Sequence, residues 1–172
     1  MKKKSGFTLL ELIITIALIG IVTALALPGM RAFSQNDRLT TNINTMIGHL
    51  AYARSEAVKN STQVSICISS NSINCIGASW EDGWIVYVDA DSNGSFVEDT
   101  TTGEVILRAN QALDHGNNFT SSYGNQVTYD NRGFVTATGS FLLCDARTGD
   151  FGKTINISNT GRVRFEDDST CP

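Results

Sequence analysis

The first thirty residues contain the feature that most constrains this chain, a long apolar stretch beside a basic end. Residues 7–27 are apolar apart from three threonines and Glu11, and residues 2–4 are all lysines. As an α-helix, 7–27 would be about 31 Å long, which matches the hydrocarbon thickness of a bilayer. Basic residues at one end of such a helix hold that end in the cytoplasm. The pattern predicts a helix that crosses a membrane and places the rest of the chain on the far side.

Two simpler interpretations of this segment are a secretory signal peptide and a plain membrane anchor. The apolar stretch is longer than an ordinary signal core, and no small-x-small cleavage site follows it. A plain anchor leaves Glu11 unexplained, because a carboxylate inside a bilayer is costly unless it has a partner.

Residues 4–11, Lys-Ser-Gly-Phe-Thr-Leu-Leu-Glu, resemble the class III signal of type IV prepilins and pseudopilins. In that family a membrane prepilin peptidase cuts after the glycine and methylates the new N-terminal residue. The resemblance implies cleavage between Gly6 and Phe7 and places the family's assembly glutamate at Glu11. The new α-amino group of Phe7 would be a buried cation in a fibre, and Glu11 of a neighbouring subunit would supply its anion.

Downstream of the apolar stretch, the sequence predicts a further length of helix and then a series of short strands. Apolar residues recur at steps of three and four and form one stripe on the helix, which Asn60 ends. The stripe consists of Leu39, Ile43, Met46, Leu50, Ala53 and Ala57. Strand-like segments separated by turn residues follow at 64–69, 83–89, 104–109, 125–130, 139–144, 154–158 and 162–165. One helix followed by antiparallel strands predicts an α+β fold.

The part after the apolar stretch resembles the FimT/GspH group of minor pilins and pseudopilins. The resemblance is carried by residues 80–89 (WEDGWIVYVD), 91–94 (DSNG), 104–108 (EVILR) and 158–164 (SNTGRVR). It implies a type IV pilin-like head, in which the long N-terminal helix packs on two antiparallel β-sheets. We therefore divide the chain into a leader (1–6), a transmembrane or filament-core half of the helix (7–33), and a periplasmic or exposed globular head (34–172).

All four cysteines fall in the predicted head. They form no close CxxC pair, and the chain has only two histidines, which argues against a zinc site. An even number of cysteines in an exported domain indicates disulfides. We expect a local pair, Cys67–Cys75, and a second pair, Cys144–Cys171, that ties down the C-terminus.

The formal charge of −4 argues against a general polyanion binder, so any nucleic-acid site must be a local basic patch. The segment 161–165 (GRVRF) predicts one. As a strand it places Arg162 and Arg164 on one face about 7 Å apart, which matches the phosphate spacing of an extended nucleic-acid backbone. Lys153, Arg147 and Arg132 would widen the patch. Residues 81–104 hold seven acids and no base, so charge is segregated along the chain.

In the FimT branch, some members are associated with DNA uptake during natural transformation, and a GRxR tail is the DNA-binding element proposed for them. The resemblance implies the same role for Arg162 and Arg164. The alternative is an ordinary solvated strand face, or ion pairs to neighbouring pilins or to the acids at 166–168.

Asp89, Asp91 and Asn93 have the spacing that opens a calcium loop, but the twelfth position is Thr100 instead of glutamate. A turn with solvated side chains explains the same residues, and we expect no metal and no cofactor. Catalysis has little support, because neither His49 nor His115 has a serine, cysteine or carboxylate placed to act with it.

The sequence thus predicts a minor type IV pilin that enters a pilus and binds double-stranded DNA weakly, without sequence preference, during DNA uptake. The alternatives are a type II secretion pseudopilin or a pilus-priming pilin with protein contacts only, and a surface adhesin. Expected partners are other pilin subunits, the prepilin peptidase, DNA, and the bacterial inner membrane before assembly. The head would first lie in the periplasm and then on a pilus at the cell surface.

Overall fold

The structure is a computed structural model that describes residues 7–96, 103–113 and 116–172. Its α-helix α1 runs over Leu9–Asn60. The chain divides into two compact units, one up to Asp37 and one over Arg38–Pro172. Apolar side chains of the first unit are exposed, and α1 contains a stretch that is long and apolar enough to cross a membrane. Membrane lipid or neighbouring subunits would cover such a surface.

The apolar stripe of α1 forms one wall of the core of the second unit. All six residues of the stripe, from Leu39 to Ala57, have no solvent exposure. The steps of three and four along the sequence place them on one side of the helix, as predicted. They pack with buried side chains from both β-sheets into a single cluster. Since that cluster lies wholly within Arg38–Pro172, this unit has its own core and we expect it to fold independently.

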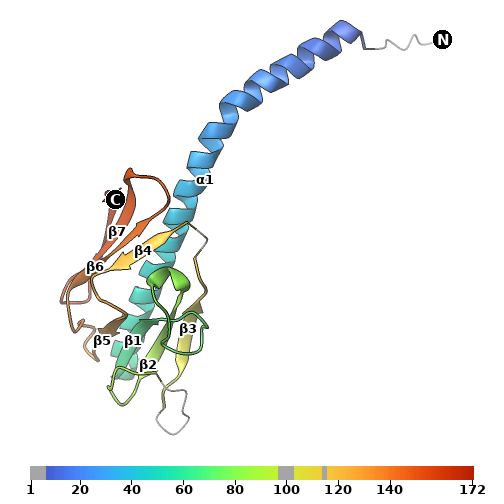
Figure 1. Cartoon of the computed structure of the whole chain (residues 1–172). Coiled ribbons are helices and arrows are strands. Elements are labelled where there is room, and N and C mark those ends of the chain that lie inside the picture. The colour runs from blue at the N-terminus through green and yellow to red at the C-terminus, as the bar shows by residue number, and fades with distance from the viewer. Residues whose placement is uncertain (1–6, 97–102, 114–115) are drawn as a thin grey trace. The chain divides into compact units, whose positions relative to one another are not determined.

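In the part of the chain that the structure describes, eight strands form two four-stranded antiparallel sheets on this part of α1 (Figure 1). The first sheet has the order β3-β2-β1-β5 and the second has the order β4-β6-β7-β8. Strands of the first sheet are β1 (Gln63–Ile68), β2 (Trp84–Asp89), β3 (Ile106–Asn110) and β5 (Gln126–Tyr129). Strands of the second sheet are β4 (Asn118–Ser121), β6 (Gly139–Cys144), β7 (Gly149–Ile157) and β8 (Val163–Cys171). A short 3-10 helix, η1 (Trp80–Asp82), precedes β2. The predicted α+β fold is confirmed.

Two disulfides fasten the head, with the pairing expected from the sequence. Cys67–Cys75 closes a local loop after β1. Cys144–Cys171 joins the last residue of β6 to the last residue of β8, so the C-terminus is attached to the second sheet.

Candidate nucleic-acid interface

The face predicted to carry the basic tail is built by the hairpin of β7 and β8. Arg164 lies opposite Asn156 in the register, while the neighbouring pair of Ile157 and Val163 packs toward the core. Because side chains alternate along a strand, Arg162 and Arg164 project together from the outer face. The structure thus brings together the two arginines that the sequence analysis singled out.

Both arginines are exposed, and their guanidinium groups form no ion pair or hydrogen bond with any residue that the structure describes. They line one side of an open groove of about 770 Å³ on the second sheet. The other lining residues are mostly polar and come from β6 and the residue before it, from β7, and from the turn after β7: Thr138, Gly139, Ser140, Asn156, Ile157, Ser158 and Thr160. Donors of this kind, next to free guanidiniums, suit a phosphate backbone.

The turn between β7 and β8 is held in place by close contacts with α1 and with the loop after β5. Arg54 of α1 donates hydrogen bonds to the carbonyl oxygens of Gly133 at 3.1 Å and Thr160 at 2.9 Å. Gly161 is buried with a φ of +73°, and a Cβ there would collide with the Gly133 carbonyl oxygen. The glycine that opens the GRVR motif is therefore required by the backbone and by the packing.

Lys153 does not belong to this face, which corrects the sequence prediction. It lies opposite the core residue Leu143 and is only 8% exposed. Its ammonium group lies 2.6 Å from a carboxylate oxygen of Asp167 and 5.7 Å from the centroid of the Phe165 ring. Alternation along β7 places Lys153 on the inner face with the buried residues Ile155 and Ile157, away from the face of Asn156.

Arg147 and Arg132 are both ion-paired, but in different settings. Arg147 contacts Asp145 at 2.7 Å, is largely buried, and lies over the Phe151 ring. Partial burial acts to raise the pKa of Asp145, but hydrogen bonds from Arg147 hold that pKa below its usual value. Arg147 is therefore committed to its own loop, and we remove it from the patch. Arg132 contacts Asp130 at 3.2 Å with 77% of its side chain exposed, and such exposed pairs are weak.

A second groove, of about 790 Å³, adds two bases that had not been connected with the tail, Arg54 and Lys59. Arg132 and Arg162 line the same groove. Lys59 lies in the last turn of α1 and pairs with Glu56 at 3.4 Å, leaving most of its side chain exposed. Arg162 lines both grooves, so it lies where they meet. The sequence signal that could have indicated this groove was the pair of bases, Arg54 and Lys59, in the last two turns of the predicted helix.

The residues predicted for processing and assembly lie at the start of the described chain. Gly6 lies outside the described residues. Phe7 and Glu11 are exposed, and the backbone N–H of Glu11 donates to the Thr8 hydroxyl at 3.2 Å. Cleavage after Gly6 and the role of Glu11 stay predictions.

His49 has a packing role in the head. Its Nδ1 accepts a hydrogen bond from the Trp84 indole N–H at 2.9 Å, which links α1 to β2. Burial, followed by the nearby positive charge of Arg108, lowers the pKa of His49 and keeps it neutral at pH 7. His115 lies outside the described residues.

The predicted calcium loop follows β2. Asp89 is buried, whereas Asp91 and Asn93 are exposed. The side-chain amide of Asn93 donates to Asp91, and its oxygen accepts the backbone N–H of Ser95 at 2.6 Å. Asn93 thus stabilises the loop, while the twelfth position, Thr100, lies outside the described residues.

The helix and two sheets have the fold of type IV minor pilins and pseudopilins. The chain is similar to the type IV minor pilin FimU of Pseudomonas aeruginosa, with a TM-score of 0.60 and 20% identity over 81% of this chain and 96% of that chain. It is also similar to the minor pseudopilin EpsH from the type 2 secretion system of Vibrio cholerae, with a TM-score of 0.51 and 12% identity over 76% of this chain and 97% of that chain. Likenesses at such low identity show the fold alone.

The family follows from the sequence matches. Residues 42–161 match the family model described as Type II transport protein GspH, and residues 1–27 match the prokaryotic N-terminal methylation motif. Because the first match covers well over half of the chain, this chain belongs to the GspH family of minor pilins and pseudopilins. No curated protein sequence matches the chain significantly.

Proposed function

We propose that this chain is a minor pilin whose head binds DNA, without sequence preference, through Arg162 and Arg164 during DNA uptake. One observation carries the proposal. In a chain of net charge −4, two neighbouring arginines project from one strand face, beside a polar groove, with no acidic partner among the described residues. Surface arginines in an acidic protein ordinarily have carboxylates near them, and an exposed pair without one is available for a phosphate.

The proposed interface extends from the two arginines toward α1. Arg132 and Lys59 share the second groove with Arg162, and both side chains are mostly exposed. Lys59 forms an ion pair with Glu56, and Arg132 forms one with Asp130 and lies over the Phe134 ring. Ion pairs made by exposed bases are weak, so a phosphate would compete with them at small cost. Each phosphate contact adds about −0.9 to the slope of log affinity against log salt. Two contacts therefore predict about a tenfold loss of affinity between 50 and 200 mM salt. Such a contact is weak, and several heads along one fibre would add avidity.

The remaining parts of the function concern how the head reaches DNA. The chain would be inserted in the bacterial inner membrane with its head in the periplasm, be cut between Gly6 and Phe7 by a prepilin peptidase, and enter a pilus with other pilin subunits. In the pilus, Glu11 would neutralise the α-amino group of a neighbouring Phe7. The match to the methylation motif at residues 1–27 supports this sequence of events.

A paired substitution tests the proposal. The variant Arg162→Gln with Arg164→Gln is compared with Arg38→Gln with Arg108→Gln, which removes the same charge elsewhere on the head. Fluorescence anisotropy with a labelled duplex at 50 mM salt measures affinity. We expect at least a tenfold loss for the first variant, less than a twofold change for the second, and unchanged thermal unfolding of the first. Equal losses in the two variants would show that only net charge matters and would overturn the assignment.

A protein-only pseudopilin or pilus-priming subunit is the second candidate. The observation that favours it is the acidic balance: without residues 1–6 the chain has 10 basic and 17 acidic residues, a net charge of −7. This candidate predicts no DNA binding by the folded head at low salt, together with normal recovery of the chain in sheared filaments.

A further inference from the structure

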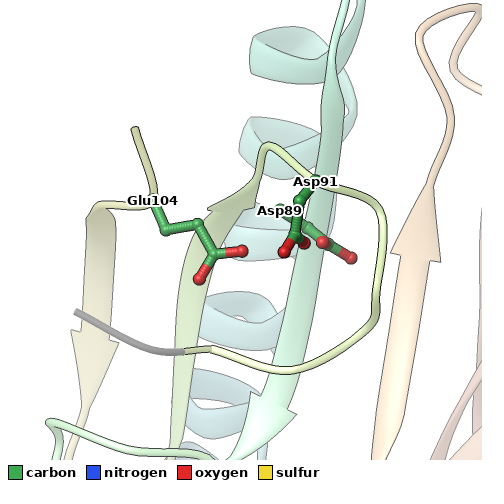
Figure 2. A group of neighbouring side chains, drawn as sticks. All are labelled: Asp89, Asp91 and Glu104. Atoms are coloured by element: carbon green, nitrogen blue, oxygen red, sulfur yellow. The ribbon is translucent and has the colours of Figure 1, made fainter. Parts of the chain in front are cut away.

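A cluster of three carboxylates lies where β2 ends and β3 approaches, on the first sheet. Asp89 is the last residue of β2, Asp91 follows in the loop, and Glu104 precedes β3. One carboxylate oxygen from each residue lies within 4.8 Å of the other two. Figure 2 shows the side chains of Asp89 and Asp91 side by side, with the Glu104 carboxylate directed toward them. The cluster lies on the sheet opposite to the one that carries the GRVR hairpin.

Pairing between the two strands brings these residues together. β2 and β3 are antiparallel, with Tyr87 opposite Ile106, and the backbone N–H of Val88 donates to the carbonyl of Val105 at 3.0 Å. The chain therefore leaves β2 at Asp89 and returns beside the same place at Glu104. Glu104 supplies a carboxylate from outside the segment whose spacing first indicated a calcium loop.

Burial leaves part of this cluster without compensation. Asp89 and Glu104 are 0% and 3% exposed. One oxygen of Asp89 accepts the Gly94 backbone N–H at 3.1 Å, but the other, Oδ1, is buried and accepts no hydrogen bond. Neither Asp89 nor Asp91 forms an ion pair with a described lysine or arginine. A buried carboxylate oxygen without a partner is costly, and two further carboxylates beside it add repulsion.

We propose that Asp89, Asp91 and Glu104 bind a divalent cation, and that the ion they fit best is Ca²⁺. The donors are all carboxylate oxygens, which hard cations prefer, and no cysteine or histidine belongs to the cluster. Carboxylate oxygens this close together can share one Ca²⁺, which takes oxygen ligands at about 2.3–2.6 Å in flexible geometry. Mg²⁺ demands near-ideal octahedral geometry and keeps several of its waters, so a cluster of protein carboxylates suits it less well. The cation would fill the place that the orphaned Asp89 oxygen faces and would join the end of β2 to the start of β3.

The affinity should lie in the range of calcium sites in proteins outside the cytoplasm. Those sites have dissociation constants of about 0.1–1 mM. Burial, ahead of the repulsion from Asp91, raises the pKa of Asp89 above its usual value.

Thermal unfolding of the full chain in a non-ionic detergent, after treatment with EDTA, tests this site. Titration with CaCl₂ to 10 mM at constant ionic strength should raise the unfolding midpoint by about 5 °C, and MgCl₂ should raise it by less than half as much. Glu104→Gln should abolish the calcium response without lowering the midpoint in EDTA, since it relieves repulsion. Glu166→Gln, an equal charge change on the other sheet, should retain the full response.

A second variant and a direct probe keep the test decisive if Glu104→Gln does not fold. Asp91→Asn changes an exposed residue and should weaken the calcium response at least fivefold. Tb³⁺ bound at the cluster should show luminescence excited through Tyr87, which lies two residues before Asp89 on the same strand face, and Ca²⁺ should quench it. No calcium response in the unmodified chain, an equal response to Mg²⁺, or a response retained in both variants would overturn the proposal.

Discussion

Gly161 offers a sharp test of how the structure presents the GRVR motif. Its backbone has a φ of +73°, and an added Cβ would meet the Gly133 carbonyl oxygen, with a ring carbon of Tyr129 at 3.0 Å. Gly161→Ala should therefore lower the free energy of unfolding for two separate reasons. The left-handed conformation costs about 1–2 kcal/mol for a residue with a Cβ. The collision adds about 1–3 kcal/mol, which is typical of overpacking. The expected total loss is about 2–5 kcal/mol.

Gly124→Ala is the matched control, because Gly124 has a φ of +66° and nothing within 4 Å of its added Cβ. It should lose only the conformational part, about 1–2 kcal/mol. Urea unfolding of residues 34–172 with intact disulfides measures both variants. With a denaturant slope of about 2 kcal/mol per molar, the midpoint should fall by about 1–2.5 M for Gly161→Ala and by about 0.5–1 M for Gly124→Ala. Equal shifts would refute the packing argument, since they would leave the left-handed backbone as the only cause.

Three further predictions concern other parts of the chain. Folding lowers the pKa of His49, so the stability that the neutral side chain contributes is complete above pH 6.5 and is lost as pH falls below that value. In His49→Gln the unfolding midpoint should therefore depend less on pH between pH 7.5 and 5. An unchanged pH dependence would contradict this role. Replacing Cys144 and Cys171 by serine opens a loop with a sequence separation of 27 and should cost about 3.5 kcal/mol in urea unfolding, and a loss below 1 kcal/mol would show that the bond adds little. Glu11→Ala should leave membrane insertion intact but remove the chain from sheared filaments, and normal recovery there would rule out the assembly role.

Local periodicity was enough to predict the helix stripe and most of the strands. The stripe from Leu39 to Ala57 repeats within one element, and its burial follows from helix geometry alone. β4 was missed because it is only four residues long and buries a single aromatic side chain, Phe119. β7 and β8 run further than predicted. The glycines before Thr154 are typical of a turn, and the acids after Phe165 are typical of a solvated loop, yet here both segments continue a hairpin that ends at a disulfide.

The candidate site also has residues that local sequence patterns predict and residues that they do not. Arg162 and Arg164 were predictable because two residues on one strand share a face whatever surrounds them. Lys153 was misplaced because its charge was counted without its strand face: alternation along β7 puts it on the inner side, where its partner Asp167 comes from the next strand. Glu104 and Arg54 joined their clusters through sheet pairing and helix packing, which are contacts between segments far apart in the sequence. No local pattern encodes such contacts.

The most direct test of the proposed function is a titration of residues 34–172, with both disulfides intact, with a short DNA duplex. Backbone amide NMR shifts would be followed at two salt concentrations. We predict salt-sensitive shifts at residues 161–165 and along the groove lined by Ser140 and Asn156, with little change near Lys153. A folded head that shows no shifts at low salt would contradict the account and would leave a subunit that binds only other proteins.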